Sequence, residues 1–326
     1  MADSDELPIE RRMATGGVWR PRFSGIPTFM RRPAREEDWT GVEVGLIGVP
    51  FDGGVTNRPG ARMGPREIRN QSSLMGLVNH QTGVRPHDLV NACDLGDVLI
   101  EGIYDLDRAI GDIERFYDRI VAAGIVPLTA GGDHAITLPI MKALARKHGP
   151  LGLVHFDAHC DTGPELYGHK HHHGGPFKVA VEEGALDPKR TIQIGIRGPS
   201  EPLWAFSYSS GMTVIHIEEL YAMGIEAVIA RARTVAGDGP LYVSFDVDGL
   251  DPVFAPATGT PEVGGFSTYE AQQMLRGLRG LHIVGADVVE VAPPLDPGYV
   301  TALVGAQMMW EELCLIAERI GAGRVA

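Results

Sequence analysis

The sequence predicts an α/β fold, a three-layer α-β-α sandwich in which helices cover both faces of a mainly parallel β-sheet. Several short runs are apolar throughout, as expected for strands that are buried on both faces. Stretches with helical spacing separate most of these runs, and strands that alternate with helices favour parallel pairing. Metal-ligand side chains follow two of the runs, at the strand ends where such sheets bind their ligands.

Each predicted element has its own signal in the sequence. A helix is indicated by apolar side chains at three- and four-residue spacing, namely Leu106, Ile110, Ile113, Phe116 and Ile120. The strand candidates are apolar for most of their length and comprise residues 41–49, the end of 121–128, 151–156, 191–196, 213–216, 241–247 and 281–289.

Two parts of the chain differ in composition. Residues 1–40 are rich in Pro and Arg and have no clean periodicity, so we expect an N-terminal arm that lies over the domain or over a neighbouring subunit. Residues 41–326 are predicted to form a single catalytic domain, because one domain of this architecture commonly exceeds about 250 residues.

Charge and hydropathy exclude several classes of protein. A net charge of −13 argues against a general binder of nucleic acid or anionic membranes, and is compatible with solubility or with cationic substrates. No uninterrupted apolar run of about 18 residues offers a membrane span. The acidic start of the chain lacks the apolar segment of a secretory signal, and the three cysteines do not form a disulfide framework. We therefore expect a cytoplasmic protein.

Residues 155–161 and 244–248 place ligand-type side chains at every second position. If both runs are extended, the ligand groups of each run share one face. Five such groups aimed at one space would repel one another unless cations lay between them. We therefore predict a site for more than one divalent metal, and metal-assisted hydrolysis as its chemistry. The five residues are Asp157, His159, Asp161, Asp246 and Asp248.

A sixth ligand candidate is His134, which follows a pair of glycines in residues 131–134. The glycines would let the backbone bend and direct His134 into the same space. Two imidazoles and four carboxylates, without thiolates, favour Mn, Fe, Co, Ni or Zn over a Cys-built zinc site. Each run alone has another interpretation, as a loop end whose side chains cap turns. Cys160 is expected to face away from the metals as a core residue.

These motifs resemble the three metal-binding motifs of the ureohydrolases, the arginase and agmatinase group. The resemblance extends over nearly the whole chain, including residues 57–65, 259–265 and 288–294. Within the group, residues 24–30 and 181–184 are most similar to the guanidinobutyrase and guanidinopropionase branch. The implied activity is metal-dependent hydrolysis of a guanidino compound to urea and an amine, with 4-guanidinobutyrate or a related guanidino acid as the expected substrate.

The resemblance also implies cofactors and residue roles. One ion would be held by His134, Asp157, Asp161 and Asp246. The other would be held by Asp157, His159, Asp246 and Asp248, so that Asp157 and Asp246 bridge. Mn²⁺ is the usual metal of the group, and Ni²⁺ is the alternative because the same ligand types suit it. Glu290 would receive the guanidinium, His173 would pass a proton to the departing amine, and Asp161 is a further catalytic candidate. A symmetric homo-oligomer, a trimer or hexamer, is implied as well.

The loop at residues 163–168 departs from the guanidino-acid branch, because Gly163 and Pro164 stand where relatives carry Asn and Asp. We assign Glu165 and Tyr167 of this loop to substrate binding. A glutamate in the pocket would disfavour a carboxylate tail by like-charge repulsion. A neutral or cationic substituted guanidine or biguanide therefore stays open as an alternative substrate.

Three other interpretations remain open. Zinc deacetylases use a similar Asp-x-His run but hold one catalytic zinc. The chain could instead be one subunit of a hetero-oligomeric ureohydrolase, paired with a homologous subunit. The His-rich stretch at residues 169–173 suggests a metal store, which would leave the carboxylate spacing unexplained. Within this stretch, His171 and His172 have no counterpart in the family pattern.

Overall fold

The structure, a computed structural model, describes residues 21–198 and 201–324. Half of the predicted arm, residues 1–20, lies outside the described residues. The rest of it is attached to the domain, because Phe29 is fully buried and its backbone N–H donates to Asp94 Oδ2 at 2.7 Å.

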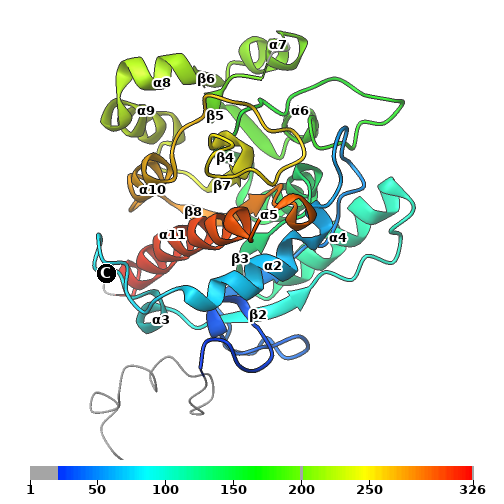
Figure 1. The fold of residues 1–326 in the computed structure, drawn as a ribbon. Helices are drawn as coiled ribbons and strands as arrows, with labels where there is room; N and C mark the ends of the chain where they lie inside the picture. Colours follow the sequence, from blue (N-terminus) through cyan, green and yellow to red (C-terminus); the bar gives the residue numbers. More distant parts are fainter. Residues whose placement is uncertain (1–20, 199–200, 325–326) are drawn as a thin grey trace, which may run out of the picture.

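An eight-stranded sheet runs through the described chain, and every strand pair in it is parallel (Figure 1). The strand order is β2-β1-β3-β8-β7-β4-β5-β6. The strands are β1 (Val44–Gly48), β2 (Ala92–Asp97), β3 (Val126–Ala130), β4 (Leu151–Phe156), β5 (Leu186–Ile196), β6 (Thr213–His216), β7 (Leu241–Asp246) and β8 (Ile283–Val289). A sheet of parallel strands has all its carboxyl ends at one edge, so the loops after β3, β4, β7 and β8 are neighbours there.

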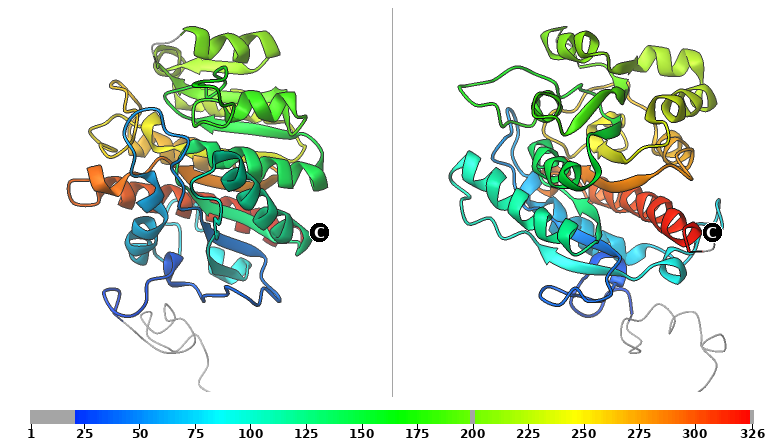
Figure 2. Two further views of the ribbon diagram at one scale, coloured as in Figure 1. Left: turned by 90° about the vertical axis from the view of Figure 1, so that its right-hand side faces the viewer. Right: turned by 180° about the vertical axis from the view of Figure 1, so that it is seen from behind.

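Helices cover both faces of the sheet, which confirms the predicted three layers (Figure 2). On one face lie α2 (Gly64–Gln71), α3 (Pro86–Leu89), α8 (Ile217–Met223), α9 (Ile225–Ala236), α10 (Thr268–Arg276) and α11 (Val300–Ala322). On the other lie α4 (Leu106–Ala122), α5 (Thr137–His148), α6 (Pro176–Glu182) and part of α7 (Glu201–Ser210). Each set packs against the sheet through its own cluster of buried apolar side chains.

Short 3₁₀ helices connect several of these elements. They are η3 (Phe29–Arg31), η4 (Ala61–Met63), η5 (Ser72–Leu74), η6 (His134–Ile136), η7 (Val247–Gly249) and η8 (Pro293–Leu295). Two of them, η6 and η7, directly follow strand ends and carry candidate ligands.

Helix α11 is long and apolar enough to cross a membrane by length and composition, but 78% of its most apolar window is buried inside the fold. It packs on β8, β3 and α2, with Met309 and Leu313 fully buried. Its apolar character therefore serves the core of the sandwich.

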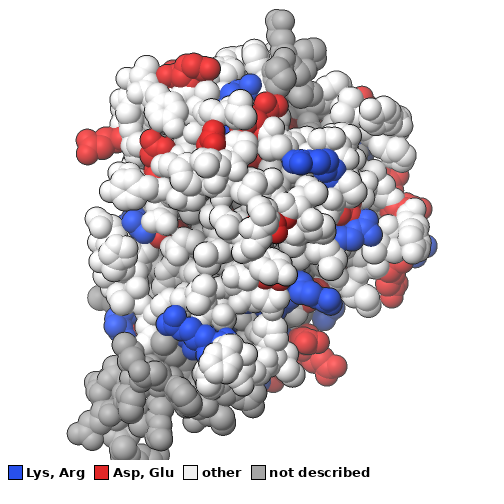
Figure 3. Space-filling model, in the orientation of Figure 1, with Lys and Arg blue, Asp and Glu red and all other residues white. Residues whose placement is uncertain are grey.

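Acidic and basic side chains are interspersed on the face of the molecule drawn in Figure 3, and neither sign forms a large continuous patch there.

Candidate metal centre

The six predicted ligands lie together at the carboxyl edge of the sheet, in loops that follow three of its central strands. His134 begins η6, just after β3; the run from Asp157 to Asp161 follows β4; Asp246 ends β7 and Asp248 lies in η7. All six are buried or nearly so. The predicted convergence of these residues is therefore present in the structure.

The local reason for this convergence differs from the predicted one, because neither run is a strand throughout. Strand β4 ends at Phe156, and Asp157 then accepts a hydrogen bond at Oδ1 from His159 N (2.6 Å), which folds the chain into a turn. Asp161 adopts a left-handed backbone, with φ of +51°. Likewise Asp246 Oδ1 accepts from Asp248 N (2.8 Å) as the cap of η7. Turns, not alternating strand faces, bring the side chains together.

The imidazole of His134 lies among three carboxylates. Its Nδ1 is 2.9 Å from Asp161 Oδ2, and 3.2 Å from both Asp157 Oδ2 and Asp246 Oδ2. Ligand atoms that share one ion at about 2.1 Å lie about 3 Å from one another when their bonds are at right angles. The spacing around His134 therefore fits a single divalent cation.

The opposite nitrogen of His134 fixes which tautomer is present. Its Nε2 lies 2.8 Å from Ser244 Oγ, and that hydroxyl donates to Asp287 Oδ1 at 2.6 Å. Because the Ser244 hydroxyl proton goes to Asp287, Ser244 accepts the Nε2 proton, so Nδ1 is the nitrogen whose lone pair could bind a cation. Burial lowers the pKa of His134, but the three carboxylates outweigh this effect and raise it well above its usual value, so a proton takes the place of the cation when none is bound. That Nδ1 is buried and has no hydrogen-bond partner among the described residues. A buried lone pair that faces three carboxylates fits a metal ligand.

A second group of ligand atoms surrounds His159. Its Nδ1 is 3.1 Å from Asp248 Oδ2 and 3.4 Å from Asp157 Oδ1. The two oxygens of Asp157 thus face different imidazoles, Oδ2 towards His134 and Oδ1 towards His159. This carboxylate has the position of a bridge between two cation sites.

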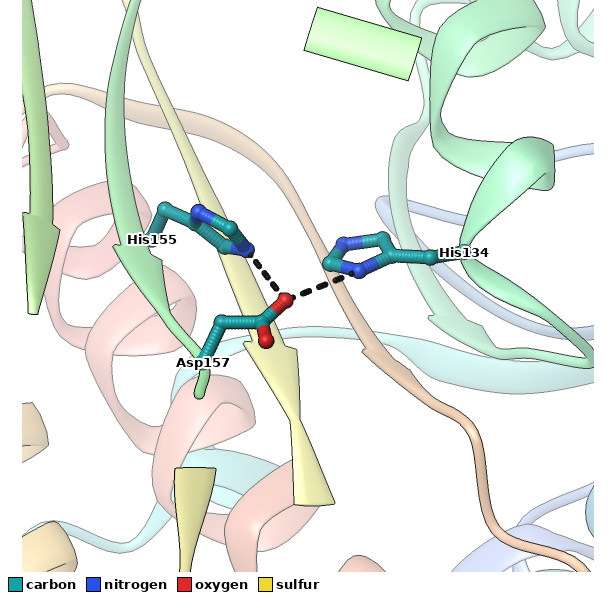
Figure 4. A group of neighbouring side chains, drawn as sticks. All are labelled: His134, His155 and Asp157. Atoms are coloured by element: carbon teal, nitrogen blue, oxygen red, sulfur yellow. Dashed lines mark hydrogen bonds and ion pairs between the residues drawn. The ribbon is translucent and has the colours of Figure 1, made fainter. Parts of the chain in front are cut away.

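His155 supports Asp157 from behind, a role that was not predicted from the sequence. Its Nε2 lies 2.7 Å from Asp157 Oδ2, the same oxygen that faces His134 (Figure 4). Gln193 donates through Nε2 to His155 Nδ1 (3.2 Å) and to Cys160 O. His155 therefore carries its proton on Nε2 and donates it to Asp157. His155 lies two residues before Asp157, and this spacing is the feature of the sequence that could have indicated its role.

The electrostatics of the cluster also fit bound cations. Burial, together with the charges of Asp248 and Asp157, raises the pKa of Asp246 well above its usual value. Burial and the charge of Asp157 raise the pKa of Asp248 to about 7. Buried carboxylates this close disfavour one another's ionisation, and divalent cations between them would remove that penalty.

His173 and Glu290 form a buried pair next to the ligand cluster. His173 Nδ1 lies 3.0 Å from Glu290 Oε1, which also accepts from His134 N (3.0 Å). The other ring nitrogen of His173, Nε2, accepts a hydrogen bond from the backbone N–H of Thr56 (3.1 Å) and lies 2.7 Å from Thr56 Oγ1. Burial lowers the pKa of His173, but Glu290 outweighs this effect and the pKa rises to about 9. Glu290 Oε2 is buried without a partner among the described residues.

A cavity of about 140 Å³ opens over the cluster. Its lining consists of Thr56, His159, Asp161, Leu166, His173, Gly174, Asp246, Asp248 and Thr260. Neither Lys nor Arg is among these residues, and Glu290 contacts the lining residue His173 without lining the cavity itself.

The two loop residues assigned to substrate binding are placed differently from the other candidates. Glu165 is exposed, and Tyr167 is 93% exposed at the tip of a turn. Leu166, between them, is the loop residue that lines the cavity. The substrate contacts of Glu165 and Tyr167 therefore stay a prediction.

The neighbouring histidines anchor this loop. His172 Nε2 lies 2.9 Å from Pro164 O, and His171 Nδ1 lies 2.8 Å from Asp107 Oδ1 near the start of α4. The sequence left the role of both residues open. Their contacts indicate that they hold the loop in place beside the cavity.

Fold and site together define a class of α/β enzymes, in which carboxylate and imidazole side chains gather beyond the carboxyl edge of a parallel sheet. The model of the arginase family matches residues 42–314, and the chain belongs to this family. It is accordingly an amidinohydrolase, as expected from its motifs.

Individual relatives give the same result. The chain is 58% identical to a guanidinopropionase of Pseudomonas aeruginosa over 303 residues, which cover 91% of this chain and 94% of the relative. It is 45% identical to a guanidinobutyrase of the same organism, with 92% and 95% covered. The solved structure of proclavaminate amidino hydrolase from Streptomyces clavuligerus is similar with a TM-score of 0.89 at 39% identity, and the match covers 92% of this chain and all of the other.

Proposed function

We propose that this chain hydrolyses 4-guanidinobutyrate or a related guanidino acid, such as 3-guanidinopropionate, to urea and the corresponding amine. The observation that carries the proposal is the position of Asp157, whose two oxygens face the imidazoles of His134 and His159. Relatives that are 58% and 45% identical are named guanidinopropionase and guanidinobutyrase, which supports a guanidino acid as the substrate.

The proposed cofactor is a pair of divalent cations. His134, Asp157, Asp161 and Asp246 would hold one ion, and Asp157, His159, Asp246 and Asp248 the other. Carboxylate and imidazole donors suit several divalent metals; Mn²⁺ is expected because it is the usual metal of the family, and Ni²⁺ is the alternative. When bound, two such ions lower the pKa of water from about 15.7 towards about 7, which makes hydroxide available at neutral pH.

Glu290 is the proposed partner of the substrate guanidinium. Its Oε2 is buried and unpaired, and a buried carboxylate oxygen of this kind is stabilised by a charge-assisted hydrogen bond from a planar cation. Its backbone has a left-handed φ of +65°, a conformation rarely used by residues other than glycine. Such local strain is typical of residues held for a function, and supports a role for Glu290 beyond packing.

His173 is the proposed proton donor for the leaving amine. The departing amine is a poor leaving group until its nitrogen is protonated, and a pKa of about 9 lets His173 carry that proton at neutral pH. Its Nε2 faces the hydroxyl of Thr56, which lines the cavity. The proton therefore has a short route to the cavity.

A neutral or cationic substituted guanidine or biguanide is the second candidate. The lining of the cavity contains neither Lys nor Arg to pair with a carboxylate tail, and its two imidazoles, His159 and His173, have other proposed roles. Glu165, on the loop at the cavity, would repel such a tail if it turned inward. This observation favours a substrate without a carboxylate.

A panel of substrates separates the two candidates. Protein loaded with Mn²⁺ or with Ni²⁺ is assayed for urea release from 3-guanidinopropionate, 4-guanidinobutyrate, agmatine and a biguanide. Urea from the guanidino acids alone would support the first proposal, and urea from the biguanide or agmatine alone would support the second. Urea from none of them, with both ions bound, would contradict both.

The assembly and the compartment are part of the same proposal. We expect a cytoplasmic homo-oligomer, a trimer or hexamer, since symmetric assemblies are common among soluble enzymes. A requirement for a homologous companion subunit would appear as activity that is present only when both chains are expressed together.

A further inference from the structure

Arg197, which directly follows β5, binds an unusual set of partners. Its guanidinium lies within hydrogen-bond distance of six backbone carbonyls, three of them at Nη2, so that one N–H of Nη2 is shared between two acceptors. The acceptors are the carbonyls of Gly195 (3.1 Å), Asp248 (2.8 Å), Gly249 (3.1 Å), Leu250 (3.1 Å), Glu262 (2.7 Å) and Val263 (3.2 Å). Within the described part of the chain, no carboxylate lies in salt-bridge contact with this arginine.

Three of these carbonyls belong to consecutive residues, 248–250, in the turn that carries the candidate ligand Asp248. Successive carbonyls at the end of a short helical turn lack partners within the turn. Arg197 satisfies them together, because its planar group presents five N–H donors in a fixed arrangement. The side chain therefore defines the course of the backbone on which Asp248 stands.

The backbone of Arg197 reaches the other ligand run. Its N–H donates to Ala158 O (2.8 Å), and the N–H of Ala158 donates to Asp248 Oδ1 (3.1 Å). Ala158 lies between Asp157 and His159. One residue thus connects the turn after β4, the turn after β7 and residues 262–263, the segments that surround His159.

Space around this connection is limited. A Cβ atom added to Gly265 would lie 2.6 Å from Arg197 Nη2, and one added to Gly249 would lie 3.0 Å from Asp157 N. The first contact is too short for a real side chain, and the second is tighter than most real Cβ contacts. The two glycines allow the turn of Asp248 to pack directly against the run of Asp157, with Arg197 as the clamp.

We propose that Arg197 is a positioning residue for one half of the metal centre, the half formed by His159 and Asp248; this inference rests on the proposed two-metal function. The other half is supported separately, since His134 is oriented by Ser244 and Asp287. Removal of the Arg197 side chain should therefore lower the affinities for the two ions unequally.

The first test is the affinity of each ion in Arg197→Met and Arg197→Lys. Loss of a residue that orients metal ligands lowers metal affinity by roughly 10–100-fold. In Arg197→Met we expect the affinity for one ion to fall by that factor, while the affinity for the other stays nearly unchanged. The fall should be smaller in Arg197→Lys. When Arg197→Met is loaded with Mn²⁺, its electron paramagnetic resonance spectrum should show a single ion, whereas the spectrum of wild type should show a coupled pair.

Arg190→Met is the matched control. Arg190 also donates only to backbone carbonyls, those of Ala236 and Pro240, but near the start of β5. At about 3.3 Å per residue it lies about 20 Å from the Arg197 end of the strand. This variant should keep both affinities.

A second measurement does not depend on metal. In the metal-free chain, amide hydrogen exchange of residues 247–251 should accelerate at least tenfold in Arg197→Met relative to Arg190→Met.

If wild type binds fewer than two ions, the proposed function fails, but the exchange result still decides the role of Arg197. Equal weakening of both ions in Arg197→Lys, or unchanged affinities together with unchanged exchange, would overturn the inference. Arg197→Lys decides the case if Arg197→Met does not fold.

Discussion

Asp157 stands between His134 and His159, with Oδ2 3.2 Å from Nδ1 of the first and Oδ1 3.4 Å from Nδ1 of the second. No other described carboxylate lies within 4 Å of both imidazoles. His155 holds it in this orientation. The proposed pairing of two cations depends on this one side chain more than on any other.

Replacement of this carboxylate should affect both ions. We expect Asp157→Asn to lose at least tenfold in affinity for each ion and to lose nearly all urea release, because an amide supplies no negative charge to either site. Inductively coupled plasma mass spectrometry on dialysed protein measures the number of metal ions bound per chain. Asp238→Asn, an exposed acid, is the control. Full occupancy of both sites in Asp157→Asn would show that Asp157 does not bridge.

His173 should matter for turnover but not for metal content. We expect His173→Asn to lower kcat by about 10²–10⁴-fold, the usual contribution of a positioned acid, while the ion count holds. In wild type, kcat should fall as the pH rises through about 9, because the imidazolium loses its proton there. That falling limb should be absent in the variant. An active variant with the wild-type pH profile would remove the assigned role.

The hydrogen bond between His134 and Ser244 should affect the affinity for one ion more than for the other. In Ser244→Ala the Nε2 proton of His134 loses its acceptor, so the ring is no longer held in the tautomer that leaves Nδ1 free. We expect about tenfold weaker binding of one ion, by isothermal titration with Mn²⁺. Ser209→Ala, an exposed helix residue, should bind both ions as wild type does. Equal affinities in both variants would contradict the tautomer argument.

Glu312 should reduce stability at neutral pH. Both of its carboxylate oxygens are buried without partners among the described residues, and burial followed by the charge of Asp287 raises its pKa well above the usual value. Above about pH 4.5 the folded chain then binds more protons than the unfolded chain, so its free energy of unfolding falls as the pH rises.

Glu312→Met removes this dependence at similar volume. We expect its free energy of unfolding, measured with urea in metal-free protein, to exceed that of wild type by about 1–3 kcal/mol at pH 7 and by less at pH 5. Glu219→Gln, at an exposed position, serves as control. A destabilised variant at pH 7 would mean that Glu312 makes a favourable interaction.

The sequence predicted much of the fold because its central strands are apolar without interruption. The predicted strands at 151–156 and 213–216 agree with β4 and β6, and the helix beginning at Leu106 is confirmed as α4. Strand β2 was not predicted. It lies at the edge of the sheet, and its sequence Ala-Cys-Asp-Leu-Gly-Asp has polar residues where a buried strand would be apolar.

The composition of the candidate site was predictable, but its construction was not. Spacing suggested that five ligands converge, and a pair of glycines added His134. The reason given for the five, alternation along strands, was wrong because turns begin at Asp157 and Asp246. The supports depend on neighbours that are distant in sequence: Gln193 behind His155, and Arg197 beside Asp248. No local pattern contains such contacts.

The metal content of fully active protein tests the central claim most directly. Purified chain is loaded with Mn²⁺, freed of excess ions, and assayed for urea release and for metal per chain in the same sample. We predict two tightly bound ions per chain, with activity lost on chelation and restored as the second ion returns. Full activity with one ion per chain, or with none, would contradict the proposed two-metal centre.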